Sequence, residues 1–170
     1  ELTEVMPGLV NEIQTWDGKE MPPPDRVLQA FASELVATFE AKRLGKAAKR
    51  LNYHQAGFRS LMMKTGKTLK EQADAEGLAA VVNDPQLFDR LKQIDKRWGD
   101  RETWAVPRHA APLHTMFFLL RAVDHDYDVN DEIVPVPEER AVLLIILFRT
   151  IYISVIVTLL CLVLGFPIAY

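Results

Sequence analysis

Residues 141–170 read AVLLIILFRTIYISVIVTLLCLVLGFPIAY, and this stretch decides how the rest of the chain is interpreted. Arg149 is its only charged residue. From Thr150 to Tyr170 a helix would be about 31 Å long at 1.5 Å per residue. Since that length matches the roughly 30 Å hydrocarbon core of a bilayer, we predict a transmembrane helix over 150–170.

Arg149 sets where the span begins. A cationic side chain at mid-bilayer costs about 2.5–3.5 kcal/mol on insertion scales, whereas one near the surface reaches water at little cost. We therefore expect Arg149, Tyr152 and Tyr170 to be interfacial anchors, with the two tyrosines near opposite interfaces. Residues 138–149 would form a lead-in helix, lying at the interface or packed on the soluble domain.

Small and hydroxyl residues interrupt the apolar run of the span. The hydroxyl residues Thr150, Ser154 and Thr158 repeat at intervals of four, and Gly165 and Pro167 follow. One interpretation is an ordinary anchor that tolerates them. The other is a helix inside a multi-helix bundle, where small residues face protein and not lipid. All five are candidates for helix packing beside a translocation path.

The charged residues all precede the span. The chain carries 20 Lys and Arg against 23 Asp and Glu, and its net charge of −3 does not favour nucleic acid as a partner. Residues 1–137 are long enough for one soluble domain with a buried core. Cys161 is the only cysteine, so no disulfide and no cysteine-based metal site can form within one chain.

Apolar residues at spacings of three and four predict amphipathic helices through the soluble part. The expected helices cover 2–16, 25–50, 58–67, 71–82, 85–98 and 101–122. Turn residues followed by Ile133, Val134 and Val136 between prolines predict a short β-hairpin near 127–136. The predicted fold class is therefore mainly α: a helical soluble domain with one hairpin, followed by one long transmembrane helix.

A cluster of acidic residues lies within this hairpin segment. Its members are Asp124, Asp126, Asp128, Asp131 and Glu132. The spacing imitates the start of a calcium-binding EF-hand loop, but Val129 and Pro135 stand where that loop needs Gly and Glu. A solvated turn is one interpretation. The other is a surface that attracts a polycationic partner.

Motifs of catalysis are missing from the sequence. His109, His114 and His125 do not have a familiar metal-ligand spacing. The 66–68 tripeptide Gly-Lys-Thr resembles the end of a phosphate-binding loop, but Leu61 stands where the first Gly is needed. We therefore predict no catalytic, cofactor or metal site, and a protein that is not itself an enzyme.

The C-terminal stretch resembles the first core transmembrane helix of ABC-importer permeases, most closely those of the spermidine/putrescine type. The matching positions are Arg149-Thr150, Ser154, Thr158 and the 164–170 run LGFPIAY. Three soluble segments, 48–53 (AKRLNY), 57–61 (GFRSL) and 97–100 (RWGD), together with VPE at 136–138, are similar to an external domain that a subset of these permeases carries.

The resemblance implies a fragment of a multi-pass permease in a bacterial inner membrane, with residues 1–149 on the periplasmic side. Substrate would cross by alternating access, and a separate subunit would hydrolyse ATP. The implied partners are membrane lipid, the other helices of the permease, a second permease subunit, a periplasmic binding protein and a cytoplasmic ABC ATPase. The first span is expected before Glu1, and the ATPase-docking loop after Tyr170.

Two other interpretations remain open. A membrane-anchored sensor would carry an external helical domain and a single signalling span. A soluble helical protein would bury its last helix, although an uncharged run of this length is long for a soluble core.

Overall fold

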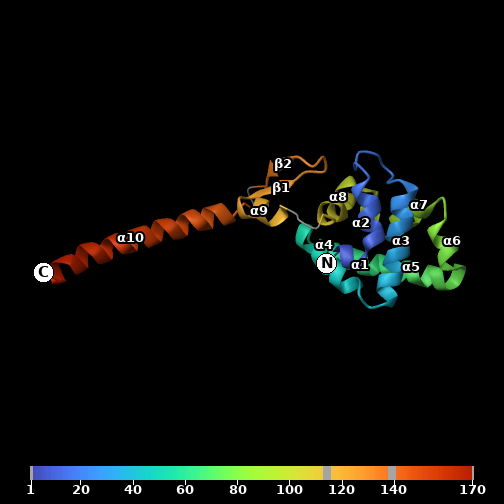
Figure 1. Ribbon diagram of the computed structural model, residues 1–170, viewed down its shortest axis with the longest axis horizontal. Coiled ribbons are helices and arrows are strands. Elements are labelled where there is room, and N and C mark those ends of the chain that lie inside the picture. The colour runs from blue at the N-terminus through green and yellow to red at the C-terminus, as the bar shows by residue number, and fades with distance from the viewer. Residues whose placement is uncertain (1, 113–115, 138–140, 170) are drawn as a thin grey trace. The chain divides into compact units, whose positions relative to one another are not determined.

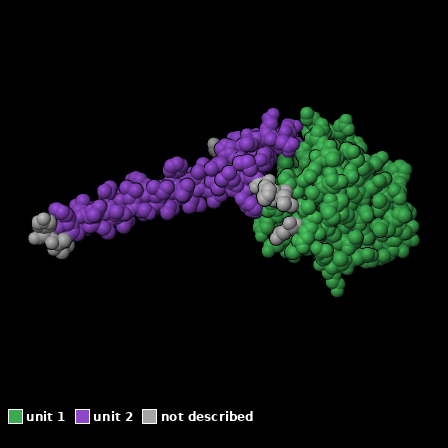
Figure 2. Space-filling view, in the orientation of Figure 1, with its two compact units in different colours: residues 1–115 green, residues 116–170 purple. Residues whose placement is uncertain are grey.

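The computed structural model describes residues 2–112, 116–137 and 141–169, with the backbone alone at 167–169. Figure 1 shows a chain that is mainly helical, with one two-stranded hairpin and one long apolar C-terminal helix. The predicted fold class is therefore confirmed. The chain divides into two compact units, residues 1–115 (unit 1) and 116–170 (unit 2), which Figure 2 colours separately.

Unit 1 is built from short helices around one core. In chain order they are α1 (Leu2–Val5), α2 (Pro7–Gln14), α3 (Asp25–Glu40), α4 (Leu44–His54), α5 (Phe58–Glu76), α6 (Leu78–Val82), α7 (Leu87–Ile94), the 3-10 helix η1 (Lys96–Gly99) and α8 (Arg101–Ala110). Helix α5 packs against α3 and α4, and α2 packs against α3. In α3 the apolar residues Val27, Phe31 and Leu35 recur at helical spacing and are all buried.

Four aromatic rings form the centre of this core. Phe31, Phe58, Trp98 and Trp104 are almost fully buried, and neighbouring ring centroids lie 4.8–6.0 Å apart. The indole N–H of Trp98 donates to Thr65 Oγ1 at 2.9 Å, and that of Trp104 donates to the Trp98 carbonyl at 2.9 Å. Both tryptophans therefore bury their rings without leaving a polar atom unpaired.

A carboxylate from α3 caps the start of α2. Glu34 accepts hydrogen bonds from the backbone N–H groups of Gly8 at 2.7 Å and Leu9 at 2.8 Å. A helix N-terminus leaves its first N–H groups without partners and carries partial positive charge, so an acidic side chain stabilises it. Here the cap is supplied from another helix because the N-cap residue, Met6, has no polar side chain.

The predicted helix over 25–50 is two helices. Lys42 has φ 56°, a left-handed conformation that glycine usually occupies at such a position, and Arg43 N–H donates to the Thr38 carbonyl at 2.9 Å. This left-handed residue and this hydrogen bond are typical of a helix C-terminus, so α3 ends at Glu40 and α4 begins at Leu44. The sequence did not signal this break because lysine holds the place of glycine.

Other helix boundaries also differ from the predictions. The helix predicted over 58–67 continues as α5 into the first part of the helix predicted over 71–82. Helix α5 ends before Gly77 (φ 90°), and the rest of the second predicted helix is the separate helix α6. The helix predicted from residue 85 begins at Leu87 as α7, and the Asp84 carboxylate just before it accepts from the Gln86 N–H. In the described part of the region 101–122, α8 ends at Ala110 and a second helix, α9 (Phe117–Ala122), follows, where one helix was predicted.

Unit 2 holds a short helix, the hairpin and the long terminal helix. Its elements are α9 (Phe117–Ala122), β1 (His125–Tyr127), β2 (Ile133–Pro135) and α10 (Leu143–Ala169). The strands are antiparallel, with Asp126 opposite Val134. The predicted hairpin is therefore present, with β1 starting two residues earlier than expected. Helix α10 is continuous from Leu143, so the described part of the expected lead-in segment includes its first turns.

Candidate membrane-spanning helix and the surfaces beside it

Helix α10 is the strongest candidate for a functional element. It has 27 residues, about 40 Å of helix. Its stretch Leu143–Phe166 has a mean hydropathy of 2.5, and none of the most apolar part of that stretch is buried. A helix that is apolar on all sides and exposed on all sides needs an apolar surrounding. Length, composition and exposure together indicate association with a membrane.

The hydroxyl groups along α10 are satisfied within the helix. Thr150, Ser154 and Thr158 each donate to the carbonyl four residues earlier, at 2.8 Å. A hydroxyl bonded in this way can enter an apolar environment without an unpaired donor. These side chains are therefore compatible with lipid and with a neighbouring helix.

One face of α10 is built from small side chains. At about 100° per residue, the side chains of five small residues project within an arc of roughly 80°. They are Thr150, Ser154, Thr158, Cys161 and Gly165, and we call this set the small-residue face. A Cβ added at Gly165 would meet no atom within 4 Å. The sequence reasoning had singled out four of these residues and missed Cys161, which the same helical spacing would have found.

The predicted anchors occupy different parts of α10. Arg149 lies six residues after Leu143, near the N-terminal end, and the Tyr152 side chain is exposed one turn later. Pro167 is within α10, but its side chain lies outside the described residues, as does all of Tyr170. The interfacial roles of these residues therefore remain predictions.

Asp124 connects the hairpin to the start of α10. Its carboxylate accepts hydrogen bonds from the backbone N–H groups of Leu143 at 3.2 Å and Leu144 at 2.8 Å. Its own carbonyl accepts from the Val136 N–H at 2.9 Å. The Asp124 side chain is buried, and its backbone is left-handed with φ 54°. This residue therefore caps the apolar helix with a charge supplied from 19 residues earlier.

The other members of the acidic cluster point to different partners. Asp126 pairs with Arg121 of α9 at 3.1 Å, and Asp128 accepts from the Asn130 side chain at 3.2 Å. Asp131 (φ 63°) and Glu132 are exposed in the turn between the strands. Asp124 is therefore buried and bonded to the start of α10, whereas Asp131 and Glu132 are exposed in the turn. Attraction of a polycation by the cluster stays a prediction.

The soluble segments that carry the permease resemblance meet at one point of unit 1. Asn52 Oδ1, from the first segment, accepts from the N–H groups of Gly57 at 3.0 Å and Arg59 at 3.2 Å in the second. Arg97 Nη1, from the third, lies 3.5 Å from the Gly57 carbonyl. Gly57 has φ 84°, which favours glycine. Together these residues shape the start of α5.

Arg97 also pairs with Asp95, a carboxyl whose pKa is strongly lowered. Asp95 accepts from the Arg97 side chain at 3.0 Å on each of its two oxygens and from the Arg97 backbone N–H at 3.2 Å. Lys64 Nζ lies 3.5 Å away. The hydrogen bonds from Arg97 hold the pKa of the Asp95 carboxyl well below its usual range. The pair orders the turn between α7 and η1.

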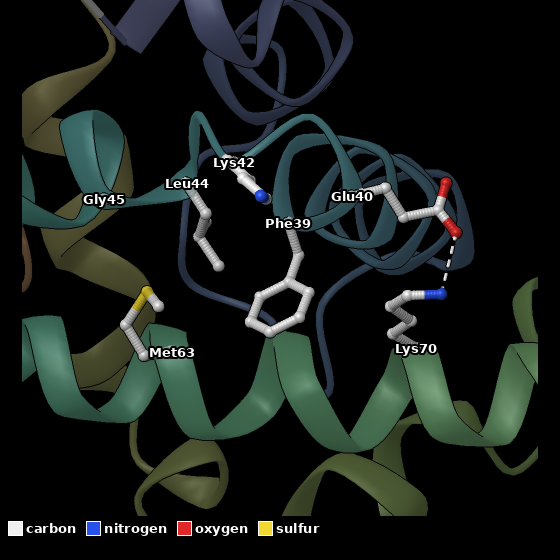
Figure 3. Close-up of a pocket in the computed structure, with 7 residues that line it drawn as sticks. All are labelled: Phe39, Glu40, Lys42, Leu44, Gly45, Met63 and Lys70. Carbon is white, nitrogen blue, oxygen red and sulfur yellow. Dashed lines mark hydrogen bonds and ion pairs between the residues drawn. The ribbon is translucent and has the colours of Figure 1, made fainter.

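Unit 1 also has a pocket between the end of α3, the start of α4 and the middle of α5. Figure 3 shows the residues that line it: Phe39, Glu40, Lys42, Leu44, Gly45, Met63 and Lys70. Its volume is about 430 Å³. The floor is apolar, while Lys70 bonds Glu40 at 3.2 Å at the rim. The hydrogen bonds that the Lys70 ammonium donates to the carboxylates of Asp74 and Glu40 raise the pKa of Lys70. The sequence reasoning had placed no site here.

Comparison with known proteins does not identify a family. Neither a protein-family model, nor a curated protein, nor a solved structure matches this chain. The residues that the structure describes form a mainly helical protein, and among them one exposed apolar helix is long enough to cross a membrane.

Proposed function

We propose that this chain is part of the membrane-spanning permease subunit of an ABC importer, with α10 as one helix of the transport bundle. The observation that carries the proposal is the small-residue face of α10. A lone lipid anchor has no need of such a face, whereas a bundle uses small residues to bring helices close together.

In this proposal, unit 1 lies on the periplasmic side and acts as a docking or gating element for a substrate-binding protein. A separate ATPase would drive the rearrangement of the helices. The proposed substrate class is polyamines such as spermidine and putrescine. The exposed acids Asp131 and Glu132 would favour a cationic substrate or its carrier at long range.

A transport experiment tests the function directly. The gene that encodes this chain is deleted in its bacterial host, and uptake of radiolabelled putrescine and spermidine is measured. We expect uptake to fall and to return when the gene is restored. Unchanged uptake of both amines in the deletion strain would overturn the polyamine assignment.

Variants of α10 in the restored gene test the role of its small-residue face. Gly165→Leu places a large side chain on this face, and Val163→Leu adds bulk on the opposite side of the helix. We expect Gly165→Leu to reduce uptake at equal membrane abundance and Val163→Leu to leave it unchanged. Equal uptake by the two variants would contradict a packed face and favour a simple anchor.

The alternative is a membrane-anchored sensor, which a single apolar helix fits equally well. The reading frame on both sides of the chain distinguishes the two. Further spans and a cytoplasmic Glu-Ala-Ala loop after Tyr170 would support the permease. A linker helix leading into a signalling domain would support the sensor.

A further inference from the structure

Unit 2 exposes apolar side chains just before α10. They are Met116, Phe118, Leu119, Val123 and Ile133, and we call this set the juxtamembrane patch. Phe118 and Leu119 are 57% and 60% exposed. Unit 1 is much longer, but in its described part only three large apolar side chains are exposed: Tyr53, Met63 and Leu78. The exposure is therefore concentrated next to the candidate span.

Hydrogen bonds tie this patch to the first turn of α10. Val123 belongs to the patch and is followed directly by Asp124, whose carboxylate accepts from Leu143 and Leu144. The Asp124 carbonyl also accepts from Val136, one residue after β2. The end of α9, the base of the hairpin and the start of α10 thus share one buried residue, which fixes the patch beside the N-terminal end of the helix.

The length of α10 sets the depth of that end. The helix is about 40 Å long, about 10 Å more than the hydrocarbon core. Arg149 favours the boundary of this core, because a cation deeper in the bilayer is costly. Leu143 lies six residues earlier, about 9 Å towards the surface. The first turns of α10, and the patch tied to them, would then lie in the layer of lipid headgroups.

The charge within the patch suits that layer. Arg121, on the same helix as Phe118, is paired with Asp126 at 3.1 Å and lies over the Phe117 ring at 5.5 Å. An apolar surface whose charge is already neutralised loses little free energy when water is replaced by lipid, and it gains free energy in proportion to the apolar area that is covered. The acidic turn residues Asp131 and Glu132 are exposed and can remain in water.

We infer that the juxtamembrane patch inserts into the headgroup layer of the bilayer beside the start of α10, as a second membrane contact of the protein. The inference rests on the proposed membrane span. The occupant of the patch is lipid, because the patch continues from the lipid-exposed helix through Asp124. Insertion of the patch fixes unit 2 on the membrane surface. The position of α10 in the bilayer is then set by this interfacial contact as well as by the length of the helix.

Site-specific fluorescence in lipid vesicles tests this. The full chain is reconstituted into phosphatidylcholine/phosphatidylglycerol vesicles and labelled with an environment-sensitive dye at one cysteine. Three positions are compared: the native Cys161 within α10, Phe118→Cys in the patch and Glu71→Cys at an exposed position of α5, the latter two in a Cys161→Ser background. Lipids with a spin-label quencher near the headgroup or deep in the chain report the depth. Leu119→Cys repeats the patch measurement independently of any local effect at residue 118.

We expect the dye at Cys161 to be quenched best by the deep label. At Phe118→Cys and Leu119→Cys we expect emission shifted to shorter wavelength than at Glu71→Cys, and the strongest quenching by the shallow label. Emission at both patch positions equal to that at Glu71→Cys would overturn the inference and leave the span intact. Shielding from aqueous iodide without quenching by either lipid would also overturn it, because protein and not lipid would cover the patch. Water-like emission at Cys161 would overturn both the membrane span and the membrane contact of the patch.

Discussion

The carboxylate of Asp124 lies 2.8 Å from the backbone nitrogen of Leu144, and this contact ties a buried carboxylate to the start of the long apolar helix α10. The first N–H groups of a helix have no partners within the helix, and the positive end of its dipole favours an anion. Asp124 meets both needs from the corner between α9 and β1. The contact therefore joins the hairpin and α10 into one unit.

Asp124→Asn tests this contact. Asparagine tolerates the left-handed backbone of this position, so the substitution removes the charge with little change of shape. We expect about 1 kcal/mol weaker bonding, since charged hydrogen bonds exceed neutral ones by about that much. The Leu143 and Leu144 amides should then exchange with deuterium about fivefold faster.

Asp131→Asn is the matched control for this exchange experiment. Asp131 also has positive φ, but it is exposed in the turn of the hairpin. We expect its substitution to leave the Leu143 and Leu144 amides unchanged. Equal exchange rates in the Asp124→Asn protein and the unaltered protein would show that the carboxylate does not hold the helix start.

Gly18 is predicted to be the least replaceable glycine of unit 1. Its φ is 72°, its carbonyl accepts from Arg101 at 3.0 Å, and an added Cβ would lie 1.6 Å from Arg108 Nη1. We expect Gly18→Ala to lower the free energy of unfolding by about 1–3 kcal/mol, from backbone strain together with displacement of Arg108. Tryptophan fluorescence during denaturation reports this, because all three tryptophans lie in unit 1.

Gly45→Ala is the control for Gly18→Ala. Gly45 lies in α4, and nothing is within 4 Å of the Cβ position. This substitution should stabilise the protein by about 0.4–1 kcal/mol, because alanine restricts the unfolded chain. A loss of stability at Gly45 as large as at Gly18 would contradict the packing described for the two sites.

Thr65→Val tests the polar bond inside the aromatic core. The substitution keeps the shape of the side chain but leaves the buried Trp98 N–H without its acceptor, which costs about 1–3 kcal/mol. Thr65→Ser retains the hydroxyl and loses one methyl group, about 0.8 kcal/mol. Equilibrium denaturation of both variants should therefore rank serine above valine, and the opposite order would show that the bond contributes nothing.

The Asp95–Arg97 pair predicts a pH dependence of stability. The pKa of Asp95 is lowered on folding, chiefly by hydrogen bonds from Arg97, so its stabilising effect is present above the ordinary carboxyl pKa of about 3.9. The effect is lost as the pH falls towards the lower folded-state pKa. Asp95→Asn should therefore be less stable than the unaltered protein at pH 7. This difference should shrink below about pH 4, as measured by denaturation at each pH. A difference that stays constant with pH would contradict the assignment.

The helical content of unit 1 could be predicted from the sequence because its apolar residues recur at helical spacing. Leu2, Leu9 and Ile13 are buried as their periodicity indicates, although Pro7 starts a new helix between them. The breaks were harder to predict. Lys42 ends α3 in a left-handed conformation, which a sequence usually reveals by a glycine at that position. Gly66, in contrast, does not end a helix: it lies inside α5, where side chains of α3 and α4 approach it closely.

The candidate membrane helix could be predicted from composition alone, since length and hydropathy are local properties. The role of Asp124 could not. Its partners, the Leu143 and Leu144 amides, lie 19 and 20 residues away and are backbone groups, which leave no mark on the sequence. For the same reason, an acidic run that suggested one cation-attracting cluster is divided between a helix cap and an exposed turn.

Extraction of the membrane fraction tests the central claim, that α10 crosses a membrane. The full chain is produced in a bacterium, and its membranes are washed with alkaline carbonate. A matched pair of variants carries Lys at Leu159 and Leu160, about 15 Å beyond Arg149, or at Ile145 and Ile146 before it. Each lysine at mid-bilayer costs about 2.5–3.5 kcal/mol. The account predicts that the unaltered protein and the Ile145→Lys/Ile146→Lys variant stay in the washed membranes until detergent is added, whereas the Leu159→Lys/Leu160→Lys variant is released. Recovery of the unaltered protein in the carbonate wash as a folded, detergent-free monomer would contradict it.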